Sequence, residues 1–124
     1  MSGWTDEELE QIANAEELQL ASAKSDGALR KPVTIWVVRL GDDVYVRSVY
    51  GRSSHWFRGT EDRHEGHIRA GGVDKDVRFV AAGDDVNDEI DAAYRTKYQG
   101  YDASIVDPLF TPEARAATLE LVPL

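Results

Sequence analysis

The strongest constraint on the fold is a stretch of strand-forming sequence interrupted by a turn. Residues 32–40 and 44–50 are rich in β-branched and aromatic side chains, and Gly41-Asp42-Asp43 between them is typical of a turn. We therefore predict a β-hairpin whose three-residue loop sets Leu40 opposite Val44.

That pairing assigns the side chains of the hairpin to two faces. One face carries Thr34, Trp36, Val38, Leu40, Val44, Val46, Ser48 and Tyr50, and the other carries Val33, Ile35, Val37, Arg39, Tyr45, Arg47 and Val49. Both faces are largely apolar, whereas a hairpin with one solvated face alternates apolar and polar residues. One face can line a barrel interior, and the other needs a helix, a ligand or a second subunit over it. The simplest explanation is that a second copy of the chain packs on this face, so we expect a homodimer.

Further strands are expected around this hairpin. Residues 67–82 predict a second hairpin with Asp74-Lys75-Asp76 as its turn, and the adjacent glycines Gly71-Gly72 predict a bulge. Residues 18–22 and 118–122 have the composition of two more strands. The sequence therefore predicts an α+β fold with about six antiparallel strands.

Helix starts are marked by capping residues. Thr5-Asp6-Glu7-Glu8 is a capping box, and Thr111-Pro112 combines a cap with proline at the first helical position. A third helix follows Gly83, with apolar residues at helical spacing and Gly100 placed to end it. These helices are expected at the periphery of the strands.

Length and composition narrow the function classes. A chain of 124 residues fits one domain over residues 1–124, and without cysteine it forms no disulfide and no thiolate site. No apolar run approaches the length of a membrane span, and no signal-peptide pattern is present, so we expect a cytoplasmic protein without a membrane partner. The net charge of −9 argues against nucleic acid as a partner.

The charge is distributed unevenly along the chain. Residues 24–71 hold nine basic and six acidic residues and all three histidines, whereas the segments on either side are strongly acidic. A basic middle third in an acidic protein is consistent with binding of a small anion. Acidic residues that simply cover solvated helix faces at both ends explain the same distribution.

Two basic segments flank the first hairpin. Lys24–Pro32 offers three cations, the Ser25 hydroxyl and a flexible glycine before a strand, which suits a phosphate. Residues 47–58 contain three arginines, and Ser53 or Ser54 can cap a helix there beside Trp56 and Phe57. A solvated loop and an ordinary strand-to-helix connection are the structural alternatives. Because the open ends of a hairpin are adjacent, both segments should meet at one end of the sheet.

These motifs resemble the FMN-binding split-barrel superfamily, most closely its deazaflavin-dependent nitroreductase branch. The similarity rests on the Lys24-Ser25-Asp26-Gly27 turn, the Arg30-Lys31-Pro32-Val33 run and the segment from Ser48 through Gly51 to Trp56. Over nearly its whole length the chain is also similar to an uncharacterised bacterial family, DUF2255. Residues 93–98 and 118–123 carry much of that similarity.

The resemblance implies a small antiparallel split β-barrel that binds FMN or an F420-type deazaflavin as an anionic cofactor, and it suggests a small-molecule oxidoreductase. It implies a phosphate site formed by Lys24, Ser25, Arg30, Lys31, Ser48, Gly51 and Arg52. Pro32, Val33 and Thr34 would present backbone to the ring, and Trp56 would support the pocket wall. Tyr50 and His55 are the nearest acid–base candidates.

Two departures from the branch favour a different hypothesis. The branch has paired glycines where this chain has Tyr50-Gly51, and Asn-Leu where it has Gly59-Thr60. The alternative is a non-catalytic dimeric ligand-binding or interaction module that keeps the fold without a redox cofactor. We expect no metal, because no further ligand at suitable spacing completes a set with His55, His64 and His67.

Overall fold

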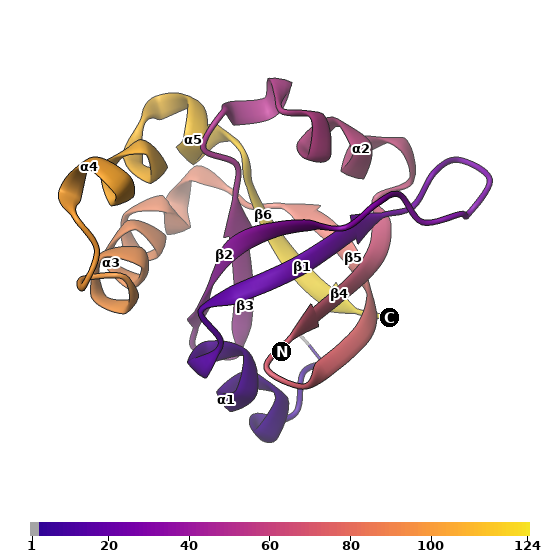
Figure 1. Ribbon diagram of the computed structural model, residues 1–124, viewed down its shortest axis with the longest axis horizontal. Helices are drawn as coiled ribbons and strands as arrows, with labels where there is room; N and C mark the ends of the chain where they lie inside the picture. Colours follow the sequence, from indigo (N-terminus) through magenta and orange to yellow (C-terminus); the bar gives the residue numbers. More distant parts are fainter. Residues whose placement is uncertain (1–2) are drawn as a thin grey trace.

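The six strands of the computed structural model, which describes residues 3–124, form a closed antiparallel barrel (Figure 1). The order around the barrel is β1-β2-β3-β6-β5-β4, and pairing of β1 with β4 closes it. The strands are β1 (Glu17–Ser22), β2 (Val33–Leu40), β3 (Asp43–Arg47), β4 (Glu65–Ala70), β5 (Val73–Ala81) and β6 (Thr118–Pro123). The predicted α+β class, with a small antiparallel barrel of about six strands and peripheral helices, is confirmed.

The helices cover both ends and one flank of this barrel. In Figure 1, α1 lies at the lower end, α2 crosses the upper end, and α3 and α4 lie on the left. The α-helices are α1 (Asp6–Asn14), α2 (His55–Arg63), α3 (Asn87–Lys97), α4 (Ala103–Val106) and α5 (Pro112–Ala116). Single 3₁₀ turns occupy Gly51–Ser53, Asp84–Val86 and Asp107–Phe110. None of the helices in residues 3–124 is both long enough and apolar enough to cross a bilayer.

Local capping signals predicted two helix starts correctly. The Glu8 amide donates to Thr5 Oγ1 at 3.1 Å and the Thr5 amide donates to the Glu8 carboxylate at 3.0 Å, which completes the capping box of α1. Thr111 Oγ1 accepts from the Ala114 amide at 3.1 Å, and Pro112 is the first residue of α5. These bonds satisfy amides that a helix leaves unpaired at its start.

The first hairpin forms, but its predicted register is wrong by one residue. Its loop is only Gly41-Asp42, so Leu40 pairs with Asp43 and not with Val44. Gly41 has φ +63°, the positive value that a two-residue loop takes at its first position. Because a slip of one residue moves every side chain to the opposite face, Val37 and Val46 point into the barrel together, whereas Val38 packs outside.

The turn predicted for the second hairpin is also wrong. Asp74-Lys75-Asp76 lies inside β5, and the loop is the glycine pair predicted as a bulge. Gly71 and Gly72 have φ of +57° and +92°, which suits a loop that needs two consecutive positive values. A Cβ on Gly71 would approach the Gln11 carbonyl oxygen to 2.2 Å, so the hairpin tip packs directly on α1.

A helix covers the outer face of the first hairpin. Tyr98 stacks on Trp36 with 3.9 Å between ring centroids, and its hydroxyl donates to the Glu16 carbonyl at 2.6 Å and accepts from the Val37 amide at 3.1 Å. Val38, Tyr45, Ile90 and Tyr94 belong to the same outer cluster, together with Val106 and Leu109. The sequence allowed a helix, a ligand or a second subunit over this face, and a helix, α3, is observed there. The apolar composition of this face therefore no longer argues for a dimer.

Candidate functional site

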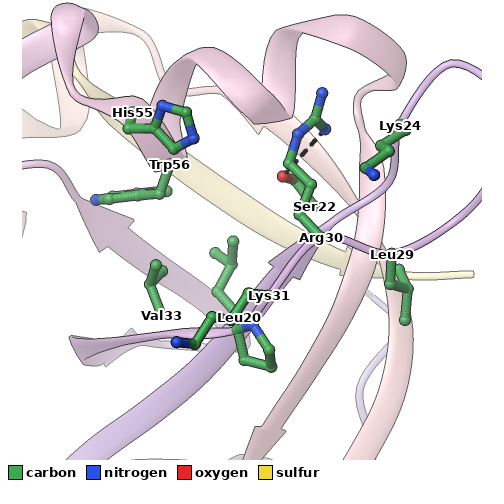
Figure 2. A pocket seen from close by; sticks show the side chains of 10 residues that line it. Leu20, Ser22, Lys24, Leu29, Arg30, Lys31, Val33, His55 and Trp56 are labelled. Atoms are coloured by element: carbon green, nitrogen blue, oxygen red, sulfur yellow. Dashed lines mark hydrogen bonds between the residues drawn. The ribbon is translucent and has the colours of Figure 1, made fainter.

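Two segments far apart in the sequence meet at the upper end of the barrel. The loop between β1 and β2 folds back on itself, with the Arg30 amide donating to the Ser22 carbonyl at 2.9 Å. Ser54 caps α2 by accepting from the Phe57 amide at 3.4 Å, which sets His55 and Trp56 at the start of the helix. The loop and the helix start enclose a hollow (Figure 2), so the predicted convergence of the two segments is observed.

This hollow, the basic cleft, has a volume of about 570 Å³. Strands β1 and β2 provide apolar residues of the lining, the loop between them provides cations, and α2 provides an aromatic residue near its start. The residues are Leu20, Ser22, Lys24, Leu29, Arg30, Lys31, Pro32, Val33, His55 and Trp56. Arg58 lies next to it, in a smaller hollow of about 180 Å³ that shares Arg30 and His55 with the basic cleft.

Most of the cations at the basic cleft have no protein partner. Within residues 3–124, the side chains of Lys24, Lys31, His55 and Arg58 form no hydrogen bond and no ion pair. Lys24 and Lys31 are exposed, so both ammonium groups are hydrated and able to reorient toward a ligand. Three unpaired positive charges and an imidazole beside one hollow favour an anionic ligand.

Arg30 differs from these cations because its partly buried guanidinium is held by protein partners. Its Nη1 donates to the carbonyl oxygens of Ala23 at 3.0 Å and Gly59 at 3.2 Å, and its Nη2 pairs with Asp62. In Figure 2 the guanidinium lies beside Ser22, whose hydroxyl is 3.4 Å from Nη1. Gly59 permits this contact, since a Cβ there would lie 2.6 Å from Ser22 Oγ. Arg30 therefore fastens the loop to α2.

Trp56 forms a wall between the basic cleft and a second apolar groove. Its ring packs edge-on against Phe57, with 5.9 Å between centroids and an interplanar angle of 69°. On the far side it lines a groove of about 270 Å³ together with Thr34, Val49 and Ile105. A flat aromatic surface next to unpaired cations suits a ligand that joins a planar ring to an anionic group.

A third hollow, also of about 570 Å³, lies on the other side of Leu29, Arg30 and Pro32 and is less suited to an anion. Its own cationic groups are His67 and Arg69, and both contact acids. His67 Nδ1 lies 2.8 Å from Asp76 and Arg69 Nε donates to Asp74 at 3.0 Å. Hydrogen bonds to Asp76, then to Asp74, raise the pKa of His67 above its ordinary value. These carboxylates neutralise the positive charge of His67 and Arg69, which an anion would need in order to bind in this hollow.

The structure brings six of the eleven predicted site residues to the basic cleft. These are Lys24, Arg30, Lys31, Pro32, Val33 and Trp56. Thr34 lines the groove behind Trp56, and Ser25 faces solvent, with its carbonyl accepting from Arg63 at 3.1 Å.

The predicted residues that follow the hairpin lie outside the basic cleft. Ser48 is buried, and its hydroxyl bonds to Ser54 Oγ at 2.7 Å. Gly51 packs against Glu113 of α5, and Arg52 lies 3.5 Å from Glu61. Of the two acid–base candidates, His55 lines the basic cleft, whereas Tyr50 is 80% exposed and does not line it.

Sequence reasoning did not anticipate three residues at this site. Leu20, Ser22 and Leu29 line the basic cleft, whereas Arg58, one of the three arginines expected near the helix start, lies beside it. The alternating pattern of β1 could have placed Leu20 and Ser22 on a common face. Among residues 3–124, no group of three or more histidine, aspartate or glutamate side chains is arranged to hold a metal ion.

Comparison with solved structures shows the same fold at low sequence identity. The crystal structure of HutZ, the heme storage protein from Vibrio cholerae, is 15% identical with a TM-score of 0.66, covering 93% of this chain and 86% of that one. An F420 reductase is 13% identical with a TM-score of 0.58, covering 93% and 91%. An FAD and heme binding protein from Mycobacterium smegmatis is 17% identical with a TM-score of 0.54, covering 94% and 64%. The fold is thus that of the split-barrel proteins.

Sequence comparison identifies the family. No curated protein sequence matches the chain. A family model described as an uncharacterized protein conserved in bacteria, DUF2255, matches residues 8–121. Because the match spans all six strands and five helices of the described fold except the first residues of α1 and the last of β6, the chain belongs to the DUF2255 family.

Proposed function

We propose that this protein binds a flavin-type cofactor, FMN or an F420-type deazaflavin, in the basic cleft and acts as a small-molecule oxidoreductase. The observation that carries the proposal is the set of unpaired cations beside the Trp56 wall. Solved proteins with this fold include an F420 reductase and an FAD and heme binding protein, which supports a cofactor of this class.

The residues present fit the two chemical parts of such a cofactor. Lys24 and Lys31, with Arg58 at the edge, would hold the phosphate, because charge-assisted hydrogen bonds to phosphate are strong and these cations have no competing partner among the described residues. Leu20, Val33 and Trp56 would provide the apolar surface for the ring. When bound, such a cofactor supplies the hydride chemistry, and the protein supplies anchoring and orientation. His55 would hold or release a proton beside the ring.

A titration of the protein with FMN and with F420 tests this proposal. We expect binding of one of them, and we expect Lys31→Ala to weaken it about tenfold, the effect of losing one charge-assisted contact. Arg52→Ala is the matched control, because Arg52 is exposed and lies outside the basic cleft. Failure of both cofactors to bind at about 100 μM, or an equal loss in the Arg52 variant, would contradict the proposal.

The second candidate is a non-catalytic module that binds heme, which differs from the module without a redox cofactor suggested by the sequence, and a specific observation favours it. Ser48 and Gly51, which the resemblance assigns to the phosphate, are committed to packing elsewhere. The unpartnered His55 in the basic cleft is a side chain able to ligate heme iron, and a heme storage protein shares the fold. The same titration with hemin separates the candidates: a heme spectrum that His55→Ala abolishes, without flavin binding, would select the module.

Homodimerisation stays a prediction. The groove behind Trp56 is where a second copy would bind, because Val49 and Ile105 there are 38% and 54% exposed and α3 does not cover them. Light scattering at micromolar concentration should give twice the 13.8 kDa mass of one chain, and Ile105→Lys should shift it to the monomer. A monomeric mass for the unmodified protein would refute the dimer.

A further inference from the structure

Lys97 has an unusual position at the seam between α3 and β2. It is the last residue of α3, and its Nζ donates to the Val37 carbonyl oxygen at 2.6 Å, close to the Tyr98 ring. Within residues 3–124 it forms no ion pair, in contrast to Lys75, whose Nζ lies 2.8 Å from Glu8. Lys97 is therefore a half-buried amine held by a neutral acceptor.

This amine borders a groove that shares no lining residue with the basic cleft. The groove has a volume of about 520 Å³ and runs between α1, β2 and α3. Most of its walls are apolar, from Ala13, Val38, Leu40 and Ala93. Arg39 also lines it. Among residues 3–124 only its Nε is engaged, with the Gly41 carbonyl at 2.7 Å, so its two terminal nitrogens are available to an anion.

The charged groups around Lys97 act in opposite directions. Glu16, before β1, favours the ammonium form, and Glu89 of α3 and Arg39 of β2 line the same groove. Burial outweighs the effect of Glu16 and lowers the pKa of Lys97 to about 8. At neutral pH the uncharged fraction is therefore about two orders of magnitude larger than for an ordinary lysine. The neighbouring Tyr98 hydroxyl stays protonated, since burial raises its pKa.

We propose that Lys97 is a nucleophilic modification site that accepts a short acyl group from an acyl phosphate bound in this groove. The lone pair on Nζ attacks the acyl carbon, the carbon–oxygen bond to phosphate breaks, and inorganic phosphate leaves with the electron pair. The proton lost from nitrogen passes to solvent. Arg39 attracts the phosphate, and the apolar walls accept the acyl chain. The amide product keeps an N–H able to donate to Val37 and removes a charge that burial disfavours.

Acetylation of the intact protein with acetyl phosphate tests the proposal, because the chain carries its own controls. Its lysines are Lys24, Lys31, Lys75 and Lys97, and peptide mass spectrometry gives a rate for each. At pH 7.5 we expect Lys97 to react about tenfold faster than Lys75, which lies outside the basic cleft and is ion-paired with Glu8, with a half-maximal rate near pH 8. In urea the two rates should become similar. A Lys97 rate equal to or below that of Lys75 in the folded protein would overturn the proposal.

Two variants distinguish specific reaction at this site from a rate that reflects only the solvent accessibility of Lys97. Glu16→Gln should move the pH midpoint of Lys97 acetylation downward, because Glu16 stabilises the ammonium form. Arg39→Gln should slow the reaction with acetyl phosphate but not with N-acetoxysuccinimide, an uncharged acetyl donor. Equal slowing with both reagents, or with neither, would overturn the assignment to acyl phosphates. Neither result depends on cofactor binding in the basic cleft.

Discussion

Replacing Arg47 with methionine is expected to lower the free energy of unfolding by about 3–5 kcal/mol, the cost of breaking a buried charged network by removing one partner. The Arg47 side chain is fully buried, with 0% of its surface exposed. It donates to Asp91 at 2.5 Å, to Thr118 Oγ1 at 2.8 Å, and to Asn87 Oδ1 and the Leu109 carbonyl, each at 3.0 Å. Methionine fills similar space but leaves all four acceptors without this donor.

Chemical denaturation of the variant and of matched controls measures the effect. Arg69→Met is the control, because Arg69 is 70% exposed and its single acidic partner is also at the surface, so little change is expected. Asp91→Asn should cost less in the Arg47→Met background than alone, since the two side chains share one interaction. A loss below about 1 kcal/mol for Arg47→Met would show that the network does not hold α3 to β3 and β6.

Replacing Arg30 with alanine is expected to lower the free energy of unfolding by about 2–3 kcal/mol, because two partly buried carbonyl oxygens lose a charged hydrogen-bond donor. Those carbonyls belong to Ala23 in the loop and Gly59 in α2, and the same guanidinium pairs with Asp62. We therefore expect weaker cofactor binding as a consequence of a displaced α2. The resemblance implied a different result, with Arg30 as a phosphate ligand whose loss leaves the fold intact.

Stability and binding measured on the same variants separate the two roles of Arg30. Asp62→Asn should reproduce part of the stability loss, because its carboxylate holds the guanidinium in place. Lys31→Ala should weaken binding while leaving the denaturation midpoint unchanged, since Lys31 is exposed and has no partner in the part of the chain that the structure describes. If the Arg30→Ala variant had the same free energy of unfolding as the unmodified protein but no longer bound the cofactor, Arg30 would be a cofactor ligand and would not hold the loop to α2.

Several features could be predicted from the residues alone, because near neighbours along the chain decide them. The Thr5 capping box and the Thr111-Pro112 start are completed by bonds within four residues, and the β-branched composition of residues 32–40 identified a strand without reference to a partner. The meeting of the Lys24–Pro32 segment with Trp56 also followed, because the open ends of any hairpin are adjacent.

The register of the first hairpin and the roles of the arginines could not be predicted from the residues alone. The loop Gly41-Asp42 depends on backbone angles that a Gly-Asp-Asp sequence does not specify, and its shift of one residue exchanges the two faces of each strand. The Gly71-Gly72 loop is different, because paired glycines are a local signal for a two-residue loop. The resemblance implied that Arg30 holds a phosphate, and Arg47 was only one of three arginines in residues 47–58. Asp62 and Asp91 lie 32 and 44 residues away from them, and barrel closure decides which acids reach which guanidinium groups.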